Sequence, residues 1–280
     1  DLSINLTASD RSVIYAFLAA KKSISAIEKD LKKSWWKKIL LSSYYYFDSS
    51  KHILQNNLQP LDLLEIKYQL EINSPSFHSK KVKIVKDKLR DLGIKKFIIF
   101  HPSAQYNYKI YPKNLRNKLL ELLSEIGIPI LVTGSSNNID LEIKNTLPNL
   151  PNIHDFIGET SIEDYLIMSE LSLAYIGMDT LNMHIAASQN KRIFAIFGPT
   201  NLLTWSPWSN KLQQCAKSNI PIQNYGQVTI FQADLPCVAC GNAGCDNNHG
   251  VSECLFEISP NDISNQVEIW MKKIELEVLK

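Results

Sequence analysis

The sequence predicts an α/β fold built on a doubly wound parallel sheet. From residue 96 to residue 200, short apolar runs alternate with segments whose apolar residues recur at helical spacing. This alternation is typical of strands connected by crossover helices. The apolar runs also end in short turns rich in Gly, Pro, Ser and Thr, which mark strand ends. With 280 residues and 45% hydrophobic content, the chain is long enough for two domains of this kind.

The expected elements fall into three parts. Residues 1–92 open with a strand at 2–6 and a helix after Ser9, and end in a linker where the apolar period is lost between 72 and 95. Residues 93–260 form the main α/β domain, and residues 261–280 contain a final helix that can pack back on the N-terminal domain. The strands expected in the main domain are 96–100, 129–132, 153–157, 173–176 and 192–197.

Composition and missing motifs exclude several classes of function. The net charge is +2, which gives no case for nucleic acid as a partner. No Gly-x-Gly-x-x-Gly follows a strand and no Walker-type glycine loop is present, so neither dinucleotide oxidoreduction nor P-loop chemistry is supported. No Asp-x-Asp lies in a suitable loop, and we therefore expect no catalytic metal and no required cofactor.

Two polar turns at the carboxyl ends of predicted strands form the main candidate site. Asp179 or Thr180 can cap the following helix, and His184 lies one turn later on the same face as Thr180. A helix N-terminus suits an anionic or hydroxyl-rich ligand, and crevices at strand carboxyl ends are where open α/β sheets bind ligands. The alternative is a purely structural cap and histidine. The second turn consists of Gly198, Pro199 and Thr200.

A second group of candidates follows the first strand of the main domain. The strand at 96–100 runs into a polar loop that contains Ser103, Ala104 and Lys109. An ammonium group at a strand's carboxyl end can neutralise a pyrophosphate, although a solvated lysine is the alternative. Ser161 begins a Ser-x-x-Asp capping box, which places the preceding Thr160 in the turn after the strand at 153–157.

These motifs together resemble those of glycosyltransferase family 9, the ADP-heptose:lipopolysaccharide heptosyltransferases. The resemblance rests on Asp179-Thr180-x-x-Met183-His184, on the Phe-Gly-Pro-Thr that follows it, and on the His-Pro, Lys109 and Pro112 pattern. Three positions depart from the usual family residues: Leu181 and Ser103 stand where Gly is usual, and Tyr111 stands where Trp is usual. The resemblance covers most of the chain and is strongest from 97 to 207.

The resemblance implies a GT-B architecture, in which two Rossmann-like domains face a cleft. The C-terminal domain, residues 93–260, would bind the ADP-heptose donor through Lys109, Asp179, Thr180 and His184, with Thr160 beside the nucleotide. The N-terminal domain would bind the lipopolysaccharide inner-core acceptor. In this comparison the N-terminal domain is incomplete, and the family's general base falls outside the chain. The alternatives are transfer from a different nucleotide sugar and a non-catalytic nucleotide-sugar-binding protein.

A cysteine-rich segment precedes the final helix. Cys237, Cys240, Cys245 and Cys254 are spaced closely enough to surround a structural zinc ion, but the second pair lacks a Cys-x-x-Cys turn. Reduced thiols in a packed loop are the alternative. Without a visible secretory signal, free thiols or a metal are favoured over disulfides, and the expected location is the cytoplasm.

The segment 34–50 is rich in lysine and aromatic residues. It includes Trp35, Trp36 and three successive tyrosines. Such a segment is compatible with peripheral contact at the inner membrane. A half-buried surface segment is the favoured alternative because no clean amphipathic period runs through it.

Overall fold

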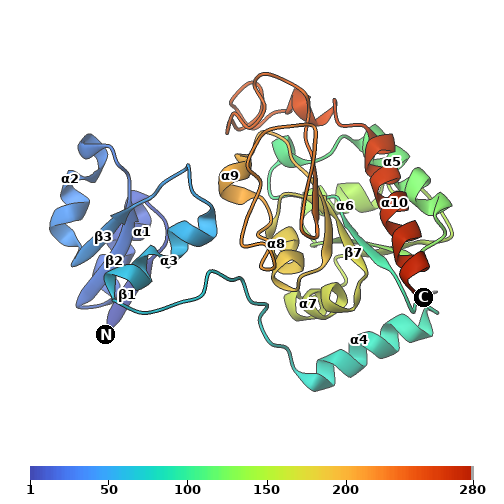
Figure 1. The fold of residues 1–280 in the computed structure, drawn as a ribbon, viewed down its shortest axis with the longest axis horizontal. Helices are drawn as coiled ribbons and strands as arrows, with labels where there is room; N and C mark the ends of the chain where they lie inside the picture. The colour runs from blue at the N-terminus through green and yellow to red at the C-terminus, as the bar shows by residue number, and fades with distance from the viewer. Residues whose placement is uncertain (279–280) are drawn as a thin grey trace. The chain divides into compact units, whose positions relative to one another are not determined.

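The computed structural model describes residues 1–278, so positions 279–280 of the expected final helix lie outside the described residues. The chain divides into two compact units (Figure 1). One unit consists of residues 1–71 and 203–205, and the other of 72–202 and 206–280. The division falls before α4 (Ser79–Asp91), whose buried Val85 and Leu89 join the core of the larger unit. Residues 72–92 therefore belong to the larger unit, although the sequence grouped them with the N-terminal part.

The smaller unit is a three-stranded parallel sheet with helices on both faces. Its strand order is β1 (Leu2–Asn5), β2 (Lys22–Ile27) and β3 (Ser43–Tyr46). Helices α1 (Asp10–Ala19) and α2 (Leu31–Leu40) share one core cluster on the sheet, around Val13 and Ile27. Helix α3 (Ile53–Leu63) follows β3, and its capping box is made by His52, which gives that histidine a structural role.

The larger unit contains a seven-stranded sheet. Its order is β6–β5–β4–β7–β8–β10–β9, and its pairs are parallel except for the β9–β10 hairpin. The first three strands are β4 (Ile98–His101), β5 (Ile130–Gly134) and β6 (Ile153–Ile157). The others are β7 (Ala174–Met178), β8 (Arg192–Ile196), β9 (Ile222–Tyr225) and β10 (Val228–Phe231). The chain adds strands outward from β4 to β6 and then returns to place β7 on the other side of β4, so the strand order reverses between β4 and β7.

Both faces of this sheet are buried, as the apolar runs predict. Along β4, Ile98 and Phe100 belong to one core cluster, whereas Phe97 and Ile99 belong to the other. Side chains of a strand alternate between faces, so this separation follows directly from the apolar run. The helices that cover the two faces are α5 (Lys113–Glu125), α6 (Asn138–Lys144), α7 (Ile162–Leu171), α8 (Leu181–Ser188) and α10 (Pro260–Val278).

The C-terminal helix packs within the larger unit. Helix α10 lies against α5 (Figure 1), and Trp270 meets the ring of Phe194 edge-on with 5.7 Å between centroids. Trp270 is partly buried and packs against the core of the larger unit. Three short helices complete the chain: η1 (Asn107–Lys109), α9 (Leu202–Trp205) and η2 (Glu253–Leu255). Among the described residues, no helix combines the length and apolarity needed to span a membrane.

Candidate functional site

A polar cavity lies where the strand order of the large sheet reverses. It has a volume of about 480 Å³ and opens at the carboxyl ends of β4, β5 and β7. Cavities of this size suit a small ligand, and the reversal point is where open α/β sheets hold one. The residues around it are His101, Ser103, Ala104, Gln105, Tyr106, Lys109, Thr133, Gly134, Ser135, Asn137, Asp140, Thr160, Ser161, Ile162, Tyr165, Asp179, Thr180, Leu181 and Asn182.

Lys109 and Asp179 form an ion pair at the edge of this cavity. Lys109 Nζ lies 3.0 Å from Asp179 Oδ2, and the two side chains are 27% and 10% exposed. The pair joins η1, in the loop after β4, to the turn after β7. Lys109 is the only Lys or Arg among the cavity residues that the structure describes. Lys109 is therefore the cationic side chain that can attract an anion into the cavity.

The N-terminus of α8 faces the same cavity. Thr180 is the N-cap residue, but its side chain makes no capping hydrogen bond. Its carbonyl accepts from the amides of Met183 and His184, at 3.1 and 3.4 Å. The helix supplies no carbonyl partner for the amides of Leu181 and Asn182, which precede Met183 and carry the partial positive charge that attracts an anion.

Leu181 is the first residue of α8, and its side chain is 65% exposed at the cavity rim. It is not among the residues with positive φ. The glycine that is usual here in the resembling family is consequently not needed for the backbone conformation. Leu181, which stands in place of that glycine, instead puts a large apolar side chain at the rim of the cavity.

His101 closes the floor of the cavity. It is 7% exposed, and its Nδ1 lies 3.0 Å from the hydroxyl of Thr133. The side-chain nitrogen of Asn182 lies 3.0 Å from Nδ1 and 3.1 Å from Nε2 of the ring. Burial lowers the pKa of His101 to about 4, against the opposing charge of Asp140. The imidazole is therefore neutral near pH 7 and can serve as a hydrogen-bonding partner.

The turn after β5 is fixed by Asp140. Its Oδ2 accepts from the amide and hydroxyl of Ser135, both at 2.6 Å, and from Asn137 at 3.0 Å. Asn137 in turn caps α6 by accepting from the amide of Asp140. These bonds hold a row of small polar groups along one side of the cavity.

The structure brings most of the predicted donor-site residues together. Lys109, Asp179, Thr180, Ser103, Ala104 and Thr160 all line the cavity. His184 does not line it, but partial burial lowers the pKa of His184, and the charges of Asp179 and Lys109 act on its ring. His184 therefore lies outside the cavity lining, and its role in donor binding stays a prediction.

The predicted turn at Gly198, Pro199 and Thr200 lies outside the cavity. A Cβ at Gly198 would come within 3.0 Å of the Leu255 side chain, and the Pro199 carbonyl accepts from the amide of Gly241 at 2.8 Å. The cysteine-rich segment therefore covers this turn. β8 is also one strand farther from the reversal point than β7.

Several cavity residues were not predicted as site residues, chiefly His101, Thr133 and Asn182. His101 and Thr133 end or follow apolar runs and His101 belongs to the His-Pro pattern, whereas Asn182 lies in the first turn of α8 and carries no comparable signal. Which of these strand ends meet depends on the strand order, and the sequence predicted the strands without their order.

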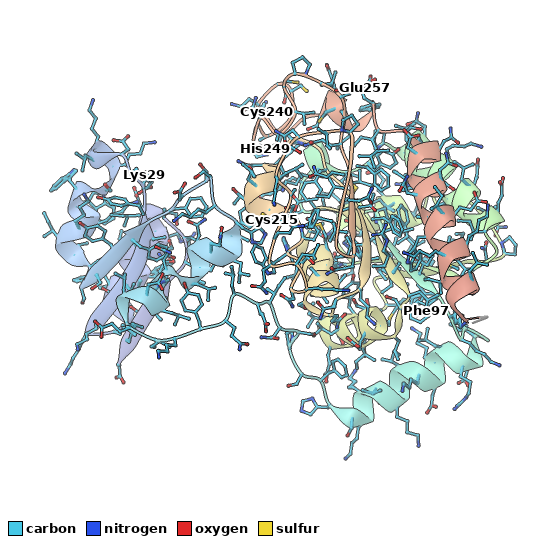
Figure 2. The ribbon with its side chains drawn as sticks, viewed as in Figure 1. Lys29, Phe97, Cys215, Cys240, His249 and Glu257 are labelled. Carbon is cyan, nitrogen blue, oxygen red and sulfur yellow. The ribbon has the colours of Figure 1, made fainter. Side chains whose placement is uncertain are left out.

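The cysteine-rich segment forms a loop of the larger unit, where Figure 2 labels Cys240 and His249. All five cysteines of the chain are free thiols. Cys254 is buried, and burial together with the charges of Cys245, Cys240 and Cys237 raises its pKa to about 11. In the described part of the chain, no three His, Cys, Asp or Glu side chains are arranged to hold a metal ion.

Comparison with known families identifies the chain. The model of glycosyltransferase family 9 (heptosyltransferase) matches residues 1–232. The chain belongs to this family. Its ion pair, open helix N-terminus and polar cavity all lie within the matched residues.

Curated relatives of this family 9 chain are distant. Lipopolysaccharide heptosyltransferase 3 of Escherichia coli K12 is 25% identical over 168 residues, which are 58% of this chain and 48% of that protein. Lipooligosaccharide heptosyltransferase 2 of Haemophilus influenzae is 27% identical over 144 residues, which are 49% of this chain and 41% of that protein. The chain thus spans about half the length of the curated relatives that it matches.

Solved structures agree in fold. ADP-heptose LPS heptosyltransferase II of E. coli matches 98% of this family 9 chain and 77% of its own, with a TM-score of 0.71 and 16% identity. E. coli heptosyltransferase WaaC with ADP matches 96% of this chain and 72% of its own, with a TM-score of 0.62 and 13% identity. At this identity the likeness shows the fold, which is the α/β fold of GT-B heptosyltransferases.

Proposed function

We propose that this family 9 chain takes part in transferring a heptosyl group from ADP-heptose to the inner core of lipopolysaccharide. The observation that carries the proposal is the ion pair of Lys109 and Asp179 beside the open N-terminus of α8, with Lys109 the one Lys or Arg among the described cavity residues. Family membership supports glycosyl transfer as the type of reaction. Solved structures of the similar E. coli heptosyltransferase WaaC contain ADP and ADP-2-deoxy-2-fluoro heptose, which supports the choice of donor.

In this proposal the donor's diphosphate lies between Lys109 and the first turn of α8. A lysine ammonium and helix amides both favour an anion, and their effects add. When the bond from the sugar to the diphosphate breaks, negative charge grows on the departing oxygen. Cationic and amide groups already in place stabilise that charge in the transition state.

Asp179 has two roles in this proposal. It orients Lys109 through the 3.0 Å ion pair, and its carboxylate can accept hydrogen bonds from sugar hydroxyls. The turn after β5 and Thr160 would hold the nucleoside, since they offer hydroxyl and amide groups rather than charge. No general base is assigned among these residues.

The exposed Leu181 favours one alternative, namely a donor with a different sugar. Its side chain occupies the cavity rim beside Asp179, where it would restrict the shape of the transferred group.

The free thiols are also consistent with a reducing compartment, and we place the reaction in the cytoplasm as part of this proposal.

Calorimetric titration with ADP, UDP and GDP tests the donor assignment. Selective ADP binding, followed by transfer from ADP-heptose to a core acceptor, would support the proposal. Preference for UDP or GDP would keep a nucleotide-sugar site and reject ADP-heptose. A folded chain that binds none of the three would reject this cavity as a donor site.

A further inference from the structure

Helix α2 presents an apolar stripe to solvent. Leu31, Trp35 and Ile39 are 65%, 60% and 74% exposed. They are spaced four residues apart, so they lie along one face of the helix over about 12 Å. Large apolar side chains gathered in this way mark an interaction surface, whereas single exposed ones do not.

The opposite face of α2 is held firmly in its unit. Lys37 is fully buried, and its Nζ lies 2.6 Å from Asp10 Oδ1 and 2.7 Å from Glu28 Oε2. Burial lowers the pKa of Lys37, but the hydrogen bonds and charges of Asp10 and Glu28 outweigh burial and raise it. Asp30 caps the helix by accepting from the amide of Lys32 at 2.9 Å. The stripe is therefore a fixed outer face, and Figure 2 shows side chains of α2 projecting away from the small sheet.

Lysines flank the stripe on both sides. At roughly 100° per residue, Lys32 lies about 60° from Trp35 on one side and Lys38 about 60° on the other. The ammonium of Lys38 donates to the hydroxyl of Tyr46 at 2.8 Å and lies over the ring of Tyr44, 5.4 Å from its centroid. Tyr46 is itself 39% exposed, so an amphipathic aromatic residue extends the same surface.

We propose that this surface, made of Leu31, Lys32, Trp35, Lys38, Ile39 and Tyr46, docks on an anionic lipid bilayer. An apolar stripe between two rows of cations matches a membrane interface, where acyl chains lie beneath negatively charged headgroups. Trp and Tyr are the side chains that favour this interface. A neutral protein groove would cover the stripe but would not match the positive charge of Lys32 and Lys38, which favours the bilayer.

The apolar stripe on α2 was not recognised in the sequence segment 34–50. That segment joins the end of a helix to strand β3, whose side chains alternate with a period of two. The stripe begins at Leu31, outside the segment, and becomes visible only when α2 is taken alone. None of the six surface residues lines the donor cavity. An experiment can therefore reject either proposal without affecting the other.

Vesicle flotation of the full chain tests the proposal. Wild-type protein is expected to float with phosphatidylcholine vesicles that contain one third phosphatidylglycerol, and to bind pure phosphatidylcholine at least about tenfold more weakly. The double variant Lys32→Glu/Lys38→Glu is expected to lose at least about tenfold in affinity for the anionic vesicles. The matched control is Lys83→Glu/Lys86→Glu, two exposed lysines of another basic helix, α4. Equal losses in both variants would overturn the proposal, because binding would then depend only on total charge.

The apolar stripe is tested separately with Leu31→Ser/Trp35→Ser/Ile39→Ser. It is expected to lose at least about tenfold in binding, while Ile269→Ser, at a position 61% exposed on α10, keeps it. Quenching by brominated lipid is expected to fall in Trp35→Phe, which still binds. ADP titration and circular dichroism of the same variants show whether each remains folded. Unchanged flotation of the folded stripe variant would overturn the proposal, as would self-association that the stripe variant abolishes while lipid binding persists.

Discussion

Replacing Lys109 is the sharpest test of the candidate donor site. In Lys109→Ala the diphosphate would lose one charge-assisted hydrogen bond, which contributes about 2 kcal/mol. Asp179, 10% exposed, would also remain as an unpaired carboxylate close to the incoming anion. Two unit charges about 5 Å apart repel by roughly 3 kcal/mol at an effective dielectric constant of 20, and solvent at the cavity mouth reduces this to about 1 kcal/mol. The total of about 3 kcal/mol predicts roughly 150-fold weaker ADP binding.

The partner substitution separates these two effects. Asp179→Asn removes the repulsion and releases Lys109, so ADP should bind as well as to wild type or a few-fold more tightly. The double variant Lys109→Ala/Asp179→Asn should recover about fivefold relative to Lys109→Ala. A nucleotide sugar should respond differently from ADP. Asp179→Asn should weaken its binding about tenfold relative to ADP, because the carboxylate can no longer accept hydrogen bonds from the sugar.

Calorimetry with ADP and ADP-heptose measures all four proteins. Lys113→Ala is the matched control, since Lys113 is an exposed lysine of the same segment that does not line the cavity. ADP binding by Lys109→Ala within threefold of wild type would refute the assignment of Lys109 as the anion-binding cation. Equal weakening of ADP binding by both single variants would instead mean that the ion pair is structural.

Three further perturbations test other parts of the structure. His101 has a pKa lowered to about 4, so its neutral form stabilises the fold fully above about pH 6.5 and less as the pH falls toward 4. Between about pH 7.5 and 4.5 the wild-type protein should lose about 2.5 kcal/mol of its free energy of unfolding through His101. Urea unfolding of His101→Gln should therefore show a smaller change of this free energy with pH. An equal change in wild type and variant would contradict the lowered pKa of His101. Gly177→Ala should destabilise the protein by about 3 kcal/mol or more, because its Cβ would lie 2.3 Å from the His101 carbonyl oxygen. The control Gly127→Ala, at φ +80° in open space, should cost only about 1 kcal/mol, and similar losses in the two would argue against the close approach. Structural zinc at the four cysteines remains a proposal that would require the exposed thiols to close around Cys254; it predicts one zinc per chain and a chelator-induced fall in Tm, and zinc-free protein with an unchanged Tm would reject it.

The strands of the main domain could be predicted because their signal is local. The segment 153–157 is strand β6 as predicted, and the apolar run at 192–197 differs from β8 by one residue. The capping box of Ser161 and Asp164 is present as predicted. Burial on both faces makes the central strands β4 and β8 nearly continuous in apolar residues, so a single run reveals each of them.

The β9–β10 hairpin was not predicted, because its first strand carries Gln223 and Asn224. Gly226, at φ +52°, supplies the turn between the strands. A lone Gly between mixed polar and apolar residues is a weak hairpin signal, and the pairing of β10 with β8 depends on residues more than thirty positions away. Local patterns carry no information on such pairings.

The candidate site depends both on local sequence motifs and on the long-range pairing of strands. Lys109 and Asp179 are seventy residues apart, and they were chosen from motifs rather than from any sign that they touch. Their contact requires β7 to lie beside β4, where His101 pairs with Gly177 in parallel register. Gly177 permits this register because a side chain there would meet the His101 backbone. The same glycine therefore sets the depth of His101, the position of Asp179 two residues later, and the distance across which Lys109 must reach. A substitution at Gly177 that left the protein folded should consequently weaken ADP binding as well, although Gly177 itself does not line the cavity.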